Sequence, residues 1–170
     1  MRSVIPICAA AALLLGLSVA APLPALAAGE TKAAEQLDLA LATKFVRARR
    51  FNQNLGPMIM RIALQTDSLT GLAETHGGKT VFRVLRDSTL ATVDKYEAAW
   101  TENLAKAYAA HLTTDEMTSI MVQGEFSPYY SAIDREQAKV SGMMRDLSYD
   151  LLGKAASETV AGVLRHFDPK

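Results

Sequence analysis

Three histidines carry the most versatile chemistry in this sequence, and their spacing does not favour a metal site. His76, His111 and His166 lie in three separate segments, and none has a histidine three or four residues away. Histidine ligands that share a helix commonly sit at such spacings, so the fold would have to gather these rings from different elements. The sequence therefore predicts no bound metal and no cofactor.

Nucleophilic and acid–base chemistry have little support either. The only cysteine, Cys8, lies in the apolar N-terminal run, and no GxSxG, phosphate-loop, GxGxxG or HExxH motif occurs. The carboxylates of Asp134, Glu136, Asp146 and Asp150 are expected on a solvated face of the last helix. We predict that the protein is not an enzyme, and a metal-free hydrolase that uses two carboxylates is the remote alternative.

The N-terminus has the pattern of a secretory signal peptide. Arg2 precedes an apolar run over residues 4–21, and Ala25-Leu26-Ala27 forms an A-x-A cleavage site. The sequence predicts a signal peptide over residues 1–27, or one residue longer, with an uncleaved membrane anchor as the alternative. Cleavage would leave a periplasmic chain without a stable membrane span, held by its core and without disulfides.

Composition favours one all-α domain over residues 28–170. The 170 residues include 18 basic and 18 acidic side chains, so the near-neutral net charge gives no support for binding to nucleic acid or an anionic membrane. Aromatic residues make up only 6% and alanine is abundant, as in helical proteins. Apolar periodicity predicts an antiparallel bundle of about five helices, over approximately residues 30–51, 57–75, 80–111, 114–123 and 128–167.

The clearest local signal begins the fourth predicted helix. Thr113 and Glu116 form a capping box, and Leu112 and Met117 occupy the positions of a hydrophobic staple. Gly124 is expected to end this helix. Ser127-Pro128 then supplies an N-cap residue and a first-turn proline for the last helix. Earlier in the chain, residues 57–75 are expected to form one uninterrupted helix.

Two groups of residues leave alternatives open. The first predicted helix has an apolar stripe and ends in Arg47, Arg49 and Arg50, which suit the helix dipole or, alternatively, an anionic ligand or lipid headgroup. Gly142 and Gly153 in the last helix either permit close helix packing or mark a break at Gly153. The expected apolar stripe of the first predicted helix consists of Ala34, Leu37, Leu41, Phe45 and Ala48.

Four aromatic residues are candidate contacts with a partner or ligand. Phe126, Tyr129 and Tyr130 surround Ser127-Pro128, where they either plug the end of the bundle or form an exposed patch. Trp100 is the only tryptophan, and it either anchors the core with its N–H paired or contacts a partner protein.

The stretch from Tyr108 to Pro128 resembles an exported bacterial domain family of unknown function, family 2059. The resemblance rests on Tyr108, Ala109, His111, Thr113, Glu116, Met117, Ser127 and Pro128, and covers approximately residues 96–152. The family's aromatic pair before Ser-Pro would fall at Gly124 and Glu125, where this chain has neither aromatic. The resemblance implies an all-helical periplasmic domain and supplies no activity.

The expected function is a non-enzymatic periplasmic interaction module with an unknown envelope partner. The alternative is a carrier or binder of an apolar, lipid-like ligand in a methionine-lined bundle core. The methionines expected to line that core are Met58, Met117, Met121, Met143 and Met144.

Overall fold

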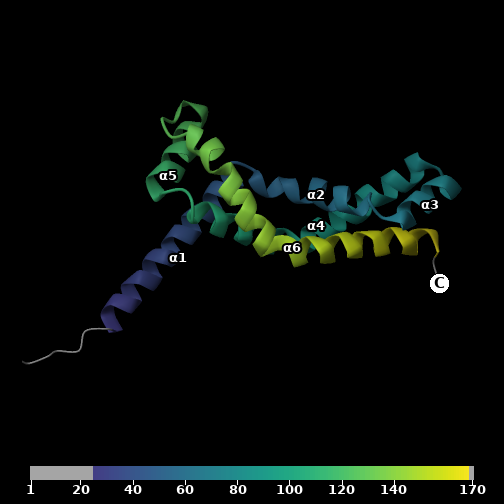
Figure 1. Ribbon diagram of the computed structural model, residues 1–170, viewed down its shortest axis with the longest axis horizontal. Coiled ribbons are helices and arrows are strands. Elements are labelled where there is room, and N and C mark those ends of the chain that lie inside the picture. Colours follow the sequence, from purple (N-terminus) through teal and green to yellow (C-terminus); the bar gives the residue numbers. More distant parts are fainter. Residues whose placement is uncertain (1–24, 169–170) are drawn as a thin grey trace, which may run out of the picture.

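The computed structural model describes residues 25–168, with side chains described from residue 36 onward. Within this range the chain forms six α-helices and two short 3-10 helices, so the all-α prediction is confirmed (Figure 1). The elements are α1 (Ala25–Ala48), η1 (Phe51–Asn54), α2 (Leu55–Ala63), α3 (Asp67–His76), α4 (Gly78–Ala109), α5 (Thr114–Gln123), η2 (Gly124–Phe126) and α6 (Ser131–Phe167).

The N-terminal prediction concerns residues outside this range. The predicted signal peptide covers residues 1–27, of which residues 1–24 lie outside the described part of the chain. Among the helices that the structure describes, none has the length and apolarity needed to cross a membrane.

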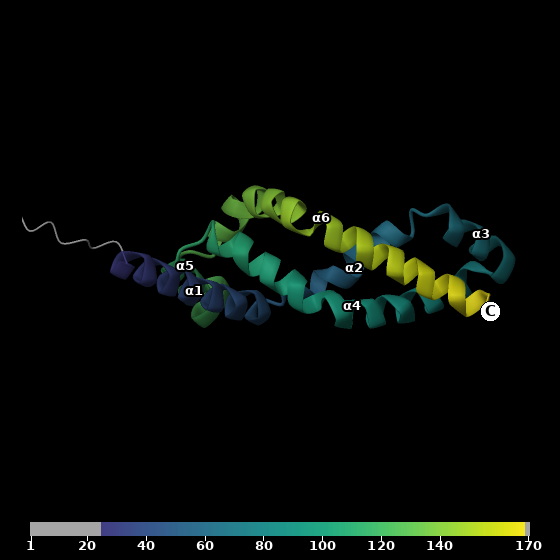
Figure 2. The same cartoon turned by 90° about the horizontal axis from the view of Figure 1, so that it is seen from below.

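The two longest helices, α4 and α6, form the axis of the molecule. They lie side by side in both views and run in opposite directions (Figures 1 and 2). Asn103 donates to the Ser148 hydroxyl at 3.0 Å, and Lys95 contacts Glu158 at 2.7 Å, so residues later in α4 pair with residues earlier in α6. Helices α1 and α5 cover one end of this pair and α3 covers the other.

Buried apolar residues form two clusters along this axis. The larger cluster joins α1, α2, α5 and the facing halves of α4 and α6 around Phe45, Ile59 and Trp100. The smaller cluster lies at the α3 end and consists of Ala63, Leu69, Val81, Val84, Leu85 and Val163. Because α4 and α6 enter both clusters, the two share one scaffold.

Small polar side chains occupy α4 and α6 where the smaller cluster begins. The Thr159 hydroxyl donates to the Thr92 hydroxyl at 3.0 Å in the buried interior, and Ser88 donates to the Thr159 carbonyl at 2.9 Å. A Cβ atom added at Gly162 would overlap Ser88 Oγ, so the two helices approach closely there. Buried hydroxyls are tolerated in such a layer because each finds a partner.

The predicted start of α5 is confirmed in detail. The Thr113 backbone N–H donates to Glu116 at 2.9 Å, and the Glu116 N–H donates back to the Thr113 hydroxyl at 3.2 Å. These bonds, led by the one from the Thr113 backbone, hold the pKa of the Glu116 carboxyl below its usual range. Leu112 and Met117 are both buried, and Gly124 ends the helix with a φ of 59°.

The prediction of one helix over residues 57–75 is wrong. Helix α2 ends at Ala63, and α3 begins at Asp67 after a turn whose last residue, Thr66, is extended. The Thr66 hydroxyl donates to the Ala63 carbonyl at 2.8 Å, which satisfies one of the acceptors left at the end of α2. Asp67 then places a negative charge in the first turn of α3, where the helix dipole favours it, and the break occurs although the apolar periodicity continues through it.

Two further expectations, for the first and the last predicted helix, are corrected. Leu37 is 72% exposed, and the buried stripe of α1 runs instead through Ala42, Phe45 and Val46. Helix α6 begins at Ser131 rather than Pro128, although the Ser127 hydroxyl does accept from the Tyr129 N–H at 3.1 Å. The intervening residues form a turn, so the predicted capping residue is present one turn before the regular helix.

Neither expectation for Gly142 and Gly153 holds. Helix α6 continues through Gly153, and a Cβ at either glycine would have no neighbouring atom within 4 Å. The glycine that does permit close helix approach is Gly162, opposite Ser88.

Candidate functional site

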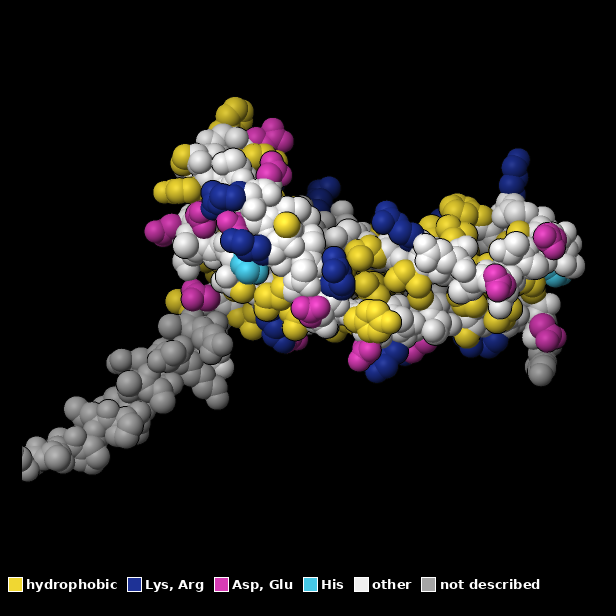
Figure 3. Space-filling model, in the orientation of Figure 1, with side chains coloured by type: hydrophobic (Ala, Val, Ile, Leu, Met, Phe, Trp, Pro, Cys, Tyr) yellow, Lys and Arg dark blue, Asp and Glu magenta, His cyan; other side chains and the backbone are white. Residues whose placement is uncertain are grey.

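A groove of about 1060 Å³ opens where α2, α4 and α6 meet. In Figure 3, hydrophobic side chains gather on the face where α2 and α6 lie side by side. The apolar lining of the groove comes mainly from these three helices, and its polar side chains come mainly from α6. The apolar lining residues are Met58, Ile62, Trp100, Leu104, Val140, Met144 and Leu152.

Helix α4 supplies one row of this lining. Trp100, Leu104 and Tyr108 follow one another at intervals of four residues and therefore lie on one face of the helix. Trp100 is only 2% exposed, and its indole N–H donates to the Asn54 side chain at 2.9 Å, which satisfies the one polar atom of the ring. The prediction of a core anchor with a paired N–H is thereby confirmed.

Stacked aromatic rings close one end of the groove. Tyr108 stacks on Phe51 with ring centroids 5.1 Å apart and meets Phe45 edge-on at 5.3 Å. Burial raises the pKa of Tyr108 to about 12, so its hydroxyl stays neutral at physiological pH. A neutral hydroxyl beside apolar rings suits an uncharged or weakly polar portion of a ligand.

Helix α6 contributes a row of small and polar residues spaced four apart. Each step of four residues turns about 40° around the helix axis, so the row winds around α6 as it borders the apolar lining. Gly153 belongs to this row, and its missing side chain leaves open space. The row consists of Gln137, Ser141, Arg145, Tyr149, Gly153 and Ser157.

Charged side chains stand at the rim with unequal partners. Glu158 accepts from Lys95 at 2.7 Å and from the Tyr96 hydroxyl at 2.8 Å, and these bonds hold the pKa of its carboxyl below the usual range. Glu158 is therefore ionised, and its charge is balanced by Lys95. An ionised carboxylate does not suit a general acid. Arg145 and Lys154 also line the groove and form no ion pair with any described carboxylate.

The methionines singled out in the sequence divide between groove and core. Met58 and Met144 line the groove. Met117 is 1% exposed within the larger cluster, while Met121 and Met143 pack against that cluster outside the groove. The site is thus an open groove with two methionines rather than an enclosed core chamber with five.

The four candidate contact residues also separate. Phe126 is 93% exposed and Tyr129 is 44% exposed at the turn between α5 and α6. Tyr130 turns inward, where its hydroxyl lies 3.3 Å from an Arg49 nitrogen and its ring lies beneath the guanidinium. Trp100 lies in the groove and is not part of this aromatic turn.

The histidines and the acidic residues of α6 do not assemble a catalytic or metal site. His76 stacks on Phe167 at 4.5 Å and His166 meets the same ring edge-on, while His111 lies near the start of α5. Within the described residues, no three potential ligands gather to hold a metal. Glu136 is buried rather than solvated, and hydrogen bonds from Lys139 and then Arg135 lower the pKa of its carboxyl.

Sequence reasoning missed the groove itself, although part of it is visible in the sequence. The small and polar residues of α6 recur every four positions, and each of the buried residues Val140, Met144 and Ser148 directly precedes one of them. A row of this kind could have indicated a helix edge that is left uncovered. The opposite wall, from Met58 and Ile62 of α2, depends on tertiary packing that no local pattern records.

Comparisons with protein-family models, with curated proteins and with solved structures find no match to this chain. The resemblance to family 2059 therefore stays a prediction.

Proposed function

We propose that the protein binds an apolar or amphiphilic small molecule in the groove between α2, α4 and α6. The observation that carries this proposal is the combination of an apolar lining from three helices with a charged and polar rim on α6. Ligand sites typically have this composition, with volumes of roughly 300–1,000 Å³. The export predicted from the N-terminus would place this binding in the bacterial envelope.

The lining suits a flexible hydrocarbon chain better than a rigid polar ligand. Met58 and Met144 have unbranched, polarisable side chains that adapt to different shapes. Leu104, Ile62 and Val140 add aliphatic surface, and the described residues that line the groove include no histidine. An acyl chain along this surface would remove apolar area from water, which is the main source of affinity expected here.

The rim favours an anionic head group on such a ligand. Glu158 is neutralised by Lys95, so the cations of Arg145 and Lys154 face only the carboxylate of Asp150 among the remaining charged lining residues. A carboxylate or phosphate head group would supply the missing negative charge through charge-assisted hydrogen bonds. The resulting candidate ligand class is a single-chain anionic amphiphile.

Trp100 provides an internal reporter for the experiment. It is the only tryptophan and it lines the groove, so its emission should change when a hydrocarbon chain packs beside the indole. Delipidated protein titrated with dodecanoate should show a saturable change in emission and a one-to-one complex by native mass spectrometry. A linear response without a complex would contradict the proposal.

Two glycines of α6 supply a matched pair of variants. Gly153→Phe places a ring in the groove, and Gly142→Phe places the same ring outside it, and neither added Cβ meets an atom within 4 Å. We expect Gly153→Phe to weaken dodecanoate binding at least about tenfold, since it competes for the apolar surface that the chain would bury. Equal affinities in the two variants would place binding elsewhere.

An interaction module remains the second candidate, and one observation favours it. Phe126, with 93% of its surface exposed, projects from the turn between α5 and α6 without covering any other side chain of the core. Large exposed aromatic residues are common at contact surfaces. This candidate uses a different region from the groove, so the two functions can be tested separately.

A further inference from the structure

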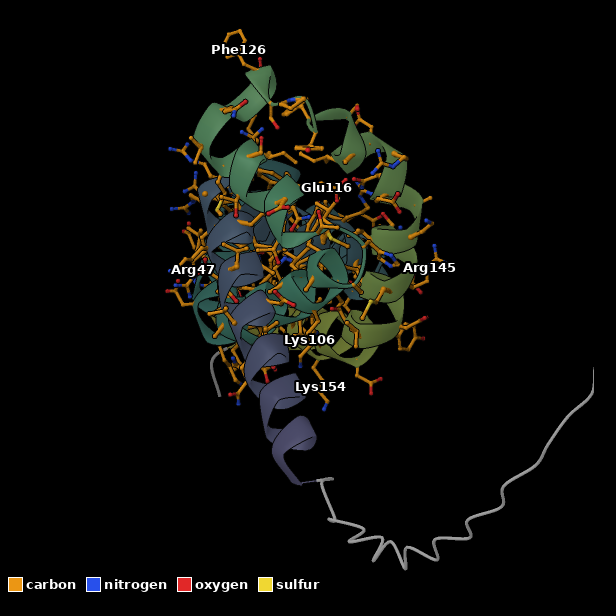
Figure 4. The ribbon with its side chains drawn as sticks, turned by 90° about the vertical axis from the view of Figure 1, so that its left-hand side faces the viewer. Arg47, Lys106, Glu116, Phe126, Arg145 and Lys154 are labelled. Atoms are coloured by element: carbon orange, nitrogen blue, oxygen red, sulfur yellow. The ribbon has the colours of Figure 1, made fainter. Side chains whose placement is uncertain are left out.

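A convex tip forms one end of the molecule. We define the tip as Val122, Phe126 and Tyr129, whose exposed fractions are 79%, 93% and 44%. Figure 4 shows Phe126 extending beyond the ribbon at the far end of the hairpin formed by α5 and α6. The hydroxyls of Ser119 and Ser127 are hydrogen-bonded to each other at 2.8 Å, so the tip belongs to a structured turn. Because the tip is convex, it can enter a concave surface but cannot enclose a ligand.

The tip is acidic as well as apolar. Glu125 directly precedes Phe126, and Asp134 lies in the first turn of α6. Both carboxylates belong to exposed residues and form no ion pair with a described cation. The neighbouring Arg135 is already paired with two other carboxylates, at 3.2 and 3.0 Å. Figure 3 shows acidic side chains beside hydrophobic ones at this end of the molecule. A surface that fits the tip should therefore be concave, apolar and positively charged.

A second groove of this chain has these three properties. It has a volume of about 530 Å³ and lies between α2 and α4. Its charged lining consists of two arginines and no carboxylate. Arg61 is exposed and forms no ion pair with a described carboxylate, while Arg86 contacts its neighbour Asp87 at 3.1 Å. We define the second groove by its apolar residues Pro57, Met60, Leu64 and Leu90 and its basic residues Arg61 and Arg86.

The tip and the second groove lie apart within one molecule. The tip stands at the end of the hairpin of α5 and α6, whereas the second groove is lined by α2 and α4 nearer the middle of the molecule (Figure 1). Figure 1 also shows the hairpin and α2 on the same side of α6. Two molecules that run in opposite directions can therefore each present a tip to the second groove of the other.

We propose that the tip of one copy of this chain docks in the second groove of another copy, with Phe126 on the apolar lining and Glu125 facing Arg61. Burial of the tip removes apolar surface from water, and the unlike charges fix its orientation. A stable interface buries about 800 Å² on each partner, which is more than one tip of three side chains provides. A two-fold pair repeats the contact, because each copy contributes a tip and a groove. The expected assembly is a weak, reversible dimer.

The proposal names a partner for the interaction module and does not rest on ligand binding. The second groove shares no described residue with the groove between α2, α4 and α6, so a chain that stays monomeric would still bind dodecanoate there. The test is sedimentation velocity of the purified chain from about 10 µM to about 1 mM, a range that populates weak complexes. We expect a reversible shift from monomer to dimer as the concentration rises.

Matched variants assign the contact to the two surfaces. Phe126→Ser disables the tip, and Leu64→Ser/Leu90→Ser disables the second groove. We expect each to weaken self-association at least about tenfold, because large apolar side chains no longer leave water on docking. Leu37→Ser removes a side chain that is 72% exposed on α1, outside both surfaces, and this variant should associate as the unmodified chain does.

A mixture of the two disabled variants separates this contact from other modes of self-association. Phe126→Ser retains a working groove and Leu64→Ser/Leu90→Ser retains a working tip, so the mixture should form a heterodimer although neither variant pairs with itself. The heterodimer should be weaker than the unmodified dimer, since only one of its two contacts is intact. A contact of tip with tip, or of groove with groove, is not restored by mixing. Formation of the heterodimer also shows that both variants are folded.

Charge reversal tests the ionic part of the contact. Glu125→Lys should weaken self-association, and Arg61→Glu in the same chain should restore it. Three outcomes would overturn the proposal, namely a monomer over the whole concentration range, a mixture of the disabled variants that stays monomeric, and growth into species larger than a dimer. The first outcome would leave a different protein as the partner of the tip.

Discussion

Gly153 and Gly162 lie on the same helix, yet they stand in opposite packing environments. At Gly162 an added Cβ would overlap Ser88 Oγ of α4, whereas at Gly153 it would meet nothing within 4 Å. Gly162 lies beside the smaller cluster, where Val163 is fully buried. Gly153 borders the groove above the larger cluster. One α6 helix therefore closes the interior at its C-terminal part and leaves it open near its middle.

This difference separates the part of the molecule that is built for stability from the part that has room for a ligand. Close approach at Gly162 brings α4 and α6 into direct hydrogen bonding through Ser88 and Thr159. Around Gly153, Met58 and Leu152 border the groove without closing it. The change in direction of α6 along its length, visible in Figures 1 and 2, accompanies the passage from one packing to the other.

Removal of an aromatic ring from the larger cluster should have the greatest effect on stability. Phe45 is fully buried and packs against Phe51 and Tyr108. We expect Phe45→Ala to lower the free energy of unfolding by about 3–5 kcal/mol, measured by urea denaturation. The transitions followed by Trp100 fluorescence and by circular dichroism should coincide, because α4 and α6 connect both clusters. Separate transitions would show that the two ends unfold independently.

The glycine comparison can be tested directly with one substitution at each site. Gly162→Leu should lower the free energy of unfolding by about 1–3 kcal/mol, since its Cβ displaces Ser88. Gly153→Leu should raise it by about 0.5–1 kcal/mol, because leucine favours helix and finds open space. Thermal denaturation of both variants would decide the matter, and equal shifts would mean that the two environments do not differ.

Substitution of the two buried threonines should lower the free energy of unfolding by unequal amounts. Thr92→Val removes the acceptor of the Thr159 hydroxyl and leaves a buried donor, at a cost of about 1–3 kcal/mol. Thr159→Val should cost less, since the Thr92 hydroxyl still donates to the Ser88 carbonyl. The double variant should therefore be more stable than Thr92→Val alone. If it is less stable, the Thr159 hydroxyl has found another partner.

The smallest expected effect concerns acid stability at the rim of the groove. The pKa of Glu158 is lowered chiefly by its hydrogen bond to Lys95, so the folded protein binds this proton less readily than the unfolded chain. The stabilisation is present above the ordinary glutamate pKa and is lost as pH falls through the lowered value. Lys95→Met should raise the pKa of Glu158 in a carboxylate NMR titration. An unchanged pKa would assign the shift to Tyr96.

Features that depend only on residues close together in the chain could be predicted from the sequence. The capping box of Thr113 and Glu116 and the C-terminal role of Gly124 depend on atoms within one or two turns, and both features are present. The all-α class follows from composition and apolar periodicity for the same reason, since helices bury one face wherever they pack.

Features that depend on which helices meet could not be predicted in this way. Periodicity alone placed Leu37 in the buried stripe, although Ala42 and Val46 face the core. The alternative hypothesis of a methionine-lined core put Met117 and Met144 in one ligand chamber, although Met144 lines the groove and Met117 does not. Gly153 illustrates the limit best, because a glycine that faces empty space and a glycine that faces another helix look alike in a sequence.

The hydroxyl layer of α4 and α6 also restricts how these helices can pair. Sliding α6 along α4 by one turn, about 5.4 Å, would bring either Glu158 or His166 opposite Ser88 in place of Gly162. Neither side chain fits where a single Cβ already overlaps, and the Thr159 hydroxyl would lose Thr92. The layer thus selects one register for the two longest helices, and the position of the groove along the molecule is fixed with it.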